Sequence, residues 1–89
     1  MNFDKRALKE WRKLGGKVRM QFKKKLTERL VAPHVISDKL SGYSARYKIK
    51  LRTSGYRLVY EVNDNTITVL VLAIGKREGA EVYKTADKR

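Results

Sequence analysis

The chain has 89 residues, which suffice for one domain with a single modest hydrophobic core. It has no cysteine, which excludes disulfides and thiolate metal sites and fits a reducing cytoplasm. It has one histidine, His34, which excludes a histidine-pair nuclease and multi-histidine metal sites. The 22 lysines and arginines against 9 acidic residues give a net charge of +13. This charge favours a nucleic-acid partner over an acidic protein or an anionic membrane. The alternative is that the charge only keeps the protein in solution.

Two helices are expected at the N-terminal end. Asp4 can cap a helix from Lys5 to about Leu14, and Gly15 is expected to stop it. A second helix then runs from about Lys17 to Val31, where Pro33 ends it. Apolar residues recur at helical spacing along one side of each helix: Ala7, Leu8, Trp11 and Leu14 in the first, and Val18, Phe22, Leu26 and Leu30 in the second. The short link between them predicts an antiparallel helical hairpin.

Strands are expected after a connecting loop at residues 33–45. Basic and apolar residues alternate strictly through the first strand, which predicts that it is half-buried. The expected strands, separated by turns at residues 53–55 and 63–65, are Arg46–Arg52, Tyr56–Val62 and Thr66–Ile74. The third strand is apolar on both faces, as in a central or covered strand, and Gly75 is expected to break it. A short final helix is predicted from Glu78 to Lys88.

Pairing the strands as hairpins predicts one apolar and one basic face of the sheet. The apolar face, a core wall for the helices, collects Tyr47, Ile49, Leu51, Tyr56, Leu58, Tyr60, Val62, Ile67, Val69, Val71 and Ala73. The basic face collects Lys48, Lys50 and Arg57 beside an apolar floor of Val59, Leu70 and Leu72. Lys50 and Arg57 are predicted to lie opposite or diagonal to each other, where like charges are destabilising. Such a row of cations favours an outside polyanionic partner.

The predicted fold is therefore a single α+β domain over residues 1–89. An N-terminal antiparallel helical hairpin packs on a small, mainly antiparallel sheet of three to four strands, and a short helix ends the chain. Three segments of this domain resemble the RelE family of bacterial toxins: Asp4–Leu14 (DKRALKEWRKL), Tyr47–Tyr60 (YKIKLRTSGYRLVY) and Gly75–Tyr83 (GKREGAEVY). The resemblance covers nearly the whole chain and implies a RelE-like microbial RNase fold. It also implies the family's activity, which is cleavage of messenger RNA on the ribosome.

Two positions depart from the family pattern. Relatives usually have a longer first strand, whereas this chain offers only Met1 to about Phe3, so a short sheet edge is expected. Gly79 stands where relatives often have a basic residue, which would remove one auxiliary RNA contact.

The resemblance also implies the site residues, which are Lys48, Lys50, Arg57, Arg77 and Tyr83. Metal-independent RNA cleavage uses the ribose 2′-OH as nucleophile against the adjacent phosphate, with a base, an acid and cations that stabilise the phosphorane. Lys50 or Tyr83 is the candidate base, and Lys48 and Arg57 are expected to hold the phosphate. Arg77 is the candidate acid or charge stabiliser, although the high pKa of arginine makes proton donation costly. Clustered cations lower a lysine pKa, and a bound phosphate raises it.

Other basic residues are candidate contacts to RNA or the ribosome, with a solvated surface as the alternative. They are Lys23, Lys24, Lys25, Arg46, Arg52 and Lys76. The implied partners are a RelB-like antitoxin and the 70S ribosome with mRNA in the A site, with DNA reached only through the antitoxin. No membrane partner, cofactor or metal is expected. Two other functions stay open: inhibition of DNA gyrase by protein contact, as in the related ParE toxins, and RNA binding without catalysis.

Overall fold

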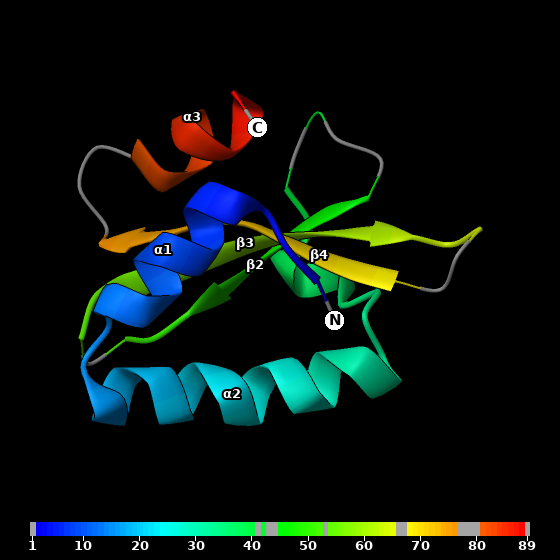
Figure 1. Ribbon diagram of the computed structural model, residues 1–89. Coiled ribbons are helices and arrows are strands. Elements are labelled where there is room, and N and C mark those ends of the chain that lie inside the picture. The colour runs from blue at the N-terminus through cyan, green and yellow to red at the C-terminus, as the bar shows by residue number, and fades with distance from the viewer. Residues whose placement is uncertain are drawn as a thin grey trace.

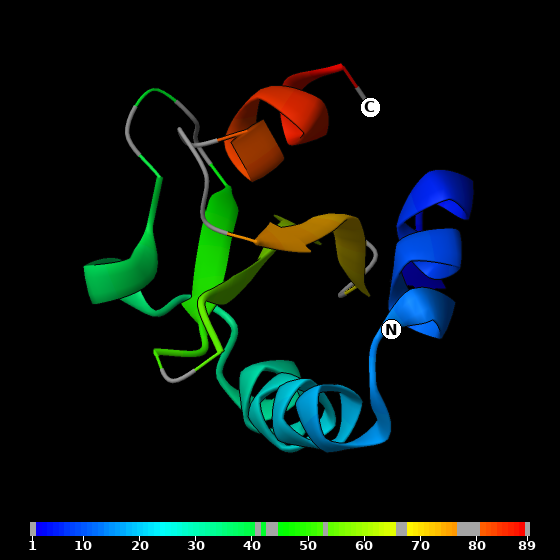
Figure 2. The ribbon, with the colours of Figure 1, turned by 90° about the vertical axis from the view of Figure 1, so that its left-hand side faces the viewer.

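A four-stranded sheet in the order β1-β4-β3-β2 organises the residues that the computed structural model describes, which are 2–40, 42, 45–52, 54–65, 68–76 and 81–88. The elements in chain order are β1 (Asn2–Phe3), α1 (Lys5–Lys13), α2 (Gly16–Val31), the 3₁₀ turn η1 (Ile36–Asp38), β2 (Arg46–Lys50), β3 (Tyr56–Asn63), β4 (Thr68–Lys76) and α3 (Glu81–Asp87). Helices α1 and α2 cover one face of the sheet and α3 lies on the other (Figures 1 and 2). The α+β class predicted from the sequence is confirmed.

Helices α1 and α2 begin and end close to the predicted positions. The Asp4 carboxylate accepts a hydrogen bond from the Arg6 amide at 2.9 Å, which caps the start of α1 as expected. The predicted stop at Gly15 is wrong by one residue, because α1 ends at Lys13 and Leu14, in extended backbone, is its C-cap. Gly15 is also extended (φ −62°) and serves as the N-cap of α2. From this turn the two helices run in opposed senses and diverge, so the hairpin is splayed and both helices contact the sheet (Figures 1 and 2).

The sheet is antiparallel except at one edge. Strands β2, β3 and β4 form consecutive antiparallel hairpins, and the two-residue β1 pairs in parallel with β4. The short edge strand expected from the N-terminal sequence is thus present. The prediction that Gly75 breaks the third strand is wrong, because Gly75 pairs with Arg57 and β4 continues to Lys76. The first predicted strand ends earlier, at Lys50 instead of Arg52.

A β-bulge changes which side chains of β4 face the helices. The register with β3 shifts after Val59, and Leu72 is the extra residue on β4. Strict alternation predicted Ala73 on the core wall, and this is wrong: Ala73 packs on the opposite face with Val59, while Ile74 joins the core wall. One residue inserted in a strand reverses the facing of the residues that follow it. Ile67, also predicted on the core wall, lies outside the described residues.

The main core lies between the sheet and the two N-terminal helices. Its largest fully buried side chains include Tyr60, Phe22 and Leu26, and the rings of Tyr47 and Tyr60 stack with centroids 5.5 Å apart. The apolar stripe of α2 stops contributing before its last member, since Leu30 is 46% exposed. The stripe prediction is therefore wrong at that residue and right at Phe22 and Leu26.

A polar network fastens the loop after α2 to this core. The Tyr60 hydroxyl donates to the Pro33 carbonyl at 2.8 Å and accepts from Arg29 Nη1 at 3.0 Å. Arg29 also forms an ion pair with Asp38 in η1 at 2.5 Å. These contacts attach Pro33 and Asp38, which lie in a segment without apolar periodicity, to Tyr60 of β3 and Arg29 of α2.

Candidate active site

The β2–β3 hairpin brings the predicted basic residues onto one face of the sheet. Lys50 pairs directly with Arg57, and Lys48 pairs with Val59. The predicted Lys50–Arg57 juxtaposition is confirmed. Side chains that alternate with the buried Tyr47 and Ile49 lie on the face away from α1 and α2. Two lysines and an arginine are therefore concentrated at one end of the hairpin.

Helix α3 brings a residue from the far end of the chain to the same place. Its apolar side contacts the sheet through residues of one cluster, which contains Val59, Leu72, Ala73, Val82 and Ala86. Arg57 Nη1 donates a hydrogen bond to the Tyr83 hydroxyl at 2.8 Å, and the Arg57 guanidinium carbon lies 5.8 Å from the centre of the Tyr83 ring. The predicted floor of the basic face is thus covered by α3, and Tyr83 joins the cation patch.

The patch changes the acid–base properties of its exposed lysine. The neighbouring Lys48 ammonium, followed by the Arg57 guanidinium, lowers the pKa of Lys50 below its ordinary value. Nearby positive charges disfavour a further one, so a larger fraction of Lys50 is neutral at a given pH than of an isolated lysine. Lys50 is exposed at the end of β2, where a substrate can reach it. This arrangement combines a proton acceptor with cations that can hold a phosphate.

Two shallow hollows meet at Lys50. One of about 320 Å³ lies over the hairpin end and is lined by Lys50, Leu51, Arg52, Gly55 and Arg57. The other, of about 450 Å³, lies between α2 and β2 and is lined by Gln21, Lys24, Lys25, Glu28, Lys50, Leu51 and Arg52. Lys50 and Arg52 line both hollows and therefore connect the cation patch with two lysines of α2. A polyanion that crosses the patch could continue along this helix.

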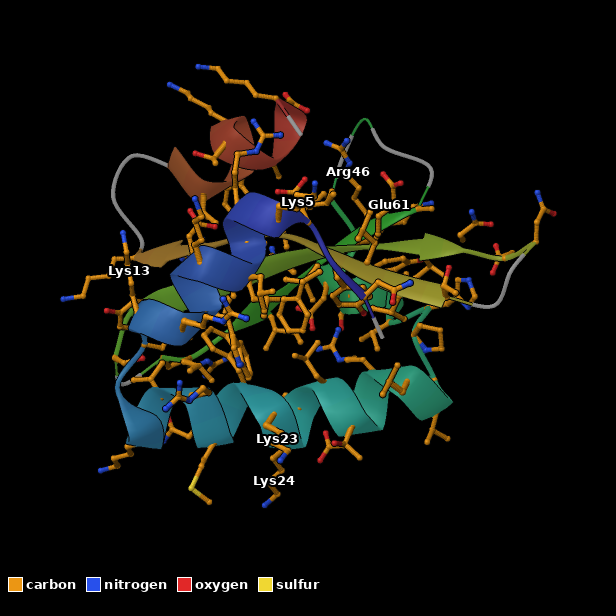
Figure 3. All side chains as sticks on the ribbon, viewed as in Figure 1. Lys5, Lys13, Lys23, Lys24, Arg46 and Glu61 are labelled. Atoms are coloured by element: carbon orange, nitrogen blue, oxygen red, sulfur yellow. The ribbon has the colours of Figure 1, made fainter. Side chains whose placement is uncertain are left out.

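The remaining predicted contacts are more scattered. Lys23 and Lys24 lie on α2 (Figure 3), but Lys23 borders a different hollow, next to Trp11. The Lys76 ammonium lies over the Tyr56 ring, 5.5 Å from its centre. Arg77 lies outside the described residues.

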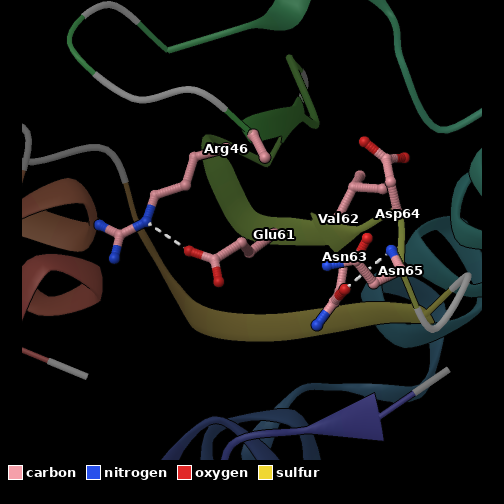
Figure 4. Close-up of a pocket in the computed structure, with 7 residues that line it drawn as sticks. Arg46, Glu61, Val62, Asn63, Asp64 and Asn65 are labelled. Atoms are coloured by element: carbon pink, nitrogen blue, oxygen red, sulfur yellow. Dashed lines mark hydrogen bonds and ion pairs between the residues drawn. The ribbon is translucent and has the colours of Figure 1, made fainter.

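Arg46, also predicted as an RNA contact, bonds two carboxylates that the sequence pattern did not predict as its partners. Its Nε is 3.1 Å from Glu61 Oε2 and its Nη1 is 3.0 Å from Asp87 Oδ1. The Glu61 contact could have been predicted, because alternation along β2 and β3 puts Arg46 and Glu61 on the same face of the sheet. The Asp87 contact could not, because no sequence pattern relates it to β2. Figures 3 and 4 show Arg46 and Glu61 side by side.

A further hollow of about 470 Å³ lies beside Arg46 (Figure 4) and is lined by Ala45, Arg46, Glu61, Val62, Asn63, Asp64 and Asn65. The Asn65 amide donates to Asn63 Oδ1 at 3.1 Å, an ordinary turn contact. The hollow is at the opposite end of the β2–β3 ladder from Lys50, roughly 13 Å away at the usual rise per residue. It therefore belongs to the turn rather than to the cation patch.

The described residues contain no group of three or more histidine, cysteine, aspartate or glutamate side chains suited to hold a metal ion. Within the same residues, every helix is too short or too polar to cross a membrane.

Comparison with known proteins identifies the family. A sequence model described as the ParE toxin of the type II toxin–antitoxin system parDE matches residues 1–80. The mRNA interferase toxin RelE of Escherichia coli strain K12 is 58% identical over 89 residues, which are 100% of this chain and 94% of the relative. A putative RelE-like toxin protein of Escherichia coli is 48% identical over the same shares of the two chains.

Solved structures agree with these matches. A variant of the E. coli toxin RelE in the free state superposes with a TM-score of 0.92 at 58% identity, covering 99% of this chain and 93% of that one. The toxin in the intact E. coli RelBE toxin–antitoxin complex gives 0.84 at 58% identity, covering 86% and 94%. The sequence and the fold together place this chain in the RelE family of the RelE/ParE superfamily of type II toxin–antitoxin toxins.

Proposed function

We propose that the chain is the toxin of a type II toxin–antitoxin system and an mRNA endoribonuclease that works at the Lys48–Lys50–Arg57–Tyr83 patch. The observation that carries the proposal is the convergence on one sheet face of Lys50, Arg57 and Tyr83, joined by the 2.8 Å hydrogen bond between the last two. The high identity to an mRNA interferase supports the same activity.

The residues divide into proton transfer and charge stabilisation. The ribose 2′-OH transfers its proton to the Lys50 amine, or to Tyr83 as the alternative base, and the O2′–P bond forms. Lys48 and Arg57 hold the phosphate and stabilise the extra charge of the phosphorane. The P–O5′ bond then breaks, which leaves a 2′,3′-cyclic phosphate and a 5′ oxygen that takes up a proton. Arg77, assigned from the family pattern, serves that oxygen as acid or charge stabiliser.

Ribosome dependence follows from what this patch lacks. The lowered pKa increases the neutral fraction of Lys50 but does not make its amine a stronger base, and an arginine is a poor acid, so the patch alone gives little proton-transfer catalysis. Holding the 2′-OH in line with the scissile P–O5′ bond can lower the activation free energy by several kcal/mol. The 70S ribosome would provide it by presenting the A-site codon, with Lys24, Lys25 and Arg52 on the ribosomal or messenger backbone.

The other partners follow from charge and family. A net charge of +13 suits an acidic antitoxin of the RelB kind, and the relatives include a RelBE toxin–antitoxin complex. Contact with DNA would come only through that antitoxin. The site of action is the cytoplasm, where ribosomes and messenger RNA meet.

Primer extension on a defined message tests the proposal. Cleavage within codons is expected when the purified protein meets translating ribosomes, and much less on the same RNA without ribosomes. Tyr83→Phe and Arg77→Ala should abolish cleavage while ribosome binding stays largely intact. Efficient cleavage of naked RNA would overturn the ribosome dependence, and unchanged cleavage by Tyr83→Phe would overturn the role of that residue.

The matching family description names a ParE toxin, which makes gyrase inhibition the second candidate. A supercoiling assay with DNA gyrase, run on the same protein preparation, separates the two functions. Inhibition of supercoiling without mRNA cleavage would favour the gyrase function and reject the nuclease.

A further inference from the structure

Arg46 links three elements of the fold at the end of the sheet away from Lys50. It is the first residue of β2, and it bonds Glu61 on β3 and Asp87, the last residue of α3. Its side chain is only 16% exposed, whereas those of Glu61 and Asp87 are 43% and 52% exposed. The arginine is thus enclosed by its partners rather than displayed on the surface.

We propose that Arg46 is a positioning residue that holds α3 on the sheet and thereby keeps Tyr83 at Arg57. The catalytic part of this proposal rests on the proposed function, in which Tyr83 contacts the RNA. The structural part concerns only the docking of α3 and can be tested without any cleavage assay.

The need for such a contact follows from the small size of α3. It has seven residues, fewer than an isolated helix needs for stability in water. Its buried apolar side chains are Val82 and Ala86, a small contact with the sheet. Docking of α3 is therefore a local equilibrium of low stability, to which one ion pair can make a measurable difference.

Two polar contacts of α3 are placed where they fix its orientation. Tyr83 and Asp87 are four residues apart and so lie on one side of the helix, where they bond Arg57 and Arg46, respectively. Those two arginines lie on the same sheet face at opposite ends of the β2–β3 ladder. One contact near each end of the short helix prevents it from pivoting about the apolar contact between them.

The geometry requires an arginine. Two different nitrogens of one guanidinium are used, Nε for Glu61 and Nη1 for Asp87. Glu61 fixes the guanidinium so that Nη1 points at α3, and Figure 4 shows the side chain running past Glu61 toward that helix. A lysine offers one ammonium and cannot reproduce this fork. The same two carboxylates balance the charge of Arg46, which assigns it to α3 rather than to RNA.

Amide hydrogen exchange tests the structural part. Arg46→Ala and Asp87→Asn should each speed exchange in α3 roughly two- to fivefold, the range of a partly exposed ion pair. The double variant should be no faster than Arg46→Ala, because both changes remove one interaction. Lys9→Ala, which removes a positive charge from the exposed side of α1, is the matched control. Unchanged exchange in both single variants, or additive effects in the double variant, would overturn the proposal.

Global unfolding is followed separately through the single tryptophan. Trp11 packs beside Phe3 with ring centroids 5.3 Å apart, in the cluster on the sheet face opposite α3. Denaturant midpoints from Trp11 fluorescence should therefore stay near wild type in Asp87→Asn. An equal loss in the Trp11 midpoint and in α3 protection would mean a general structural role, and the proposal would be wrong.

Cleavage kinetics on programmed ribosomes test the catalytic part. Arg46→Ala and Asp87→Asn should both lower kcat by about twofold or more with little change in KM, because only the docked fraction is active. Arg46→Lys should restore less than half of the loss. A higher KM in Arg46→Ala together with normal cleavage by Asp87→Asn would show that Arg46 contacts RNA, against the proposal.

Tyr83→Phe is the reference that separates the two proposals. If it cleaves as the wild type does, the proposed role of Tyr83 fails and the catalytic part fails with it. The exchange rates of α3 would still support or overturn the structural part.

Discussion

Arg57 and Tyr83, 26 positions apart in the chain, share a hydrogen bond of 2.8 Å from the guanidinium to the phenol oxygen. Arg57 pairs with Lys50 across the β2–β3 ladder, so this bond attaches the C-terminal helix to the cation patch. The phenol oxygen accepts this bond, which fixes its position beside the cations. Tyr83 is thereby oriented toward whatever the cations bind.

Tyr83→Phe removes this oxygen and keeps the ring. We expect single-turnover cleavage on ribosomes to fall about 100-fold or more, the usual contribution of a proton-transfer group. Binding to ribosomes, measured by co-sedimentation, should change little because the ring and all cations stay. Tyr56→Phe, which removes a hydroxyl at the start of β3, is the control and should cleave normally. A loss smaller than threefold would contradict a proton-transfer role for Tyr83.

Lys48→Ala should raise the pKa of Lys50, because the Lys48 ammonium is the largest cause of its lowering. NMR titration of the lysine side-chain carbons in the free protein measures this directly. Because folding lowers the pKa of Lys50, the unfolded chain binds more protons than the folded one, and the free energy of unfolding rises as the pH approaches about 10.4. Removal of Lys48 should make this rise smaller.

If Lys50 is the base, the rising limb of the pH–rate profile should move to higher pH in Lys48→Ala. A limb that stays in place would favour Tyr83 as the base.

Tyr60→Phe tests the network that holds the loop after α2. It removes a buried hydroxyl bonded to Pro33 and Arg29, and the expected loss in the free energy of unfolding is about 1–3 kcal/mol. Burial raises the pKa of Tyr60, although the bond from Arg29 opposes this. The unfolded chain then loses the phenol proton first, so the contribution of Tyr60 to stability is present below pH about 10 and declines above it. Urea titrations followed by Trp11 fluorescence near pH 8 and pH 11 should show this decline in the wild type and not in Tyr60→Phe.

The sequence was most informative where one physical rule governed the structure. Strict alternation from Arg46 to Lys50 was sufficient to predict β2, its facing and the Lys50–Arg57 pair, because a short turn leaves a hairpin few alternative registers. Helix α1 was equally predictable from its Asp4 cap and apolar spacing. The site could be completed only through family resemblance, since nothing in the pattern of residues 46–60 points to Tyr83.

The errors came from interactions between distant segments. The bulge at Leu72 leaves no signature in a run that is apolar on both faces, so alternation assigned Ala73 to the wrong side. A lone glycine weakens a strand, which predicts a break at Gly75, but its pairing with Arg57 decides the outcome. The sequence predicts Arg46 as an RNA contact because Asp87 reaches it only after α3 folds back onto the sheet.

Gly55→Ala tests whether the turn before β3 sets the site geometry. Gly55 has left-handed backbone (φ +75°), and its amide bonds the Leu51 carbonyl at 2.9 Å in the turn that closes the Lys50–Arg57 pair. A Cβ there meets no atom within 4 Å, so the cost is conformational strain of about 1 kcal/mol rather than a clash. Gly16→Ala, at the first position of α2 and equally unobstructed, should be neutral or slightly stabilising. Denaturant unfolding measures both, and Gly55→Asn should lose less stability than Gly55→Ala because asparagine tolerates this region. Equal stability of the two alanine variants would show that the left-handed turn is not needed to hold the hairpin end.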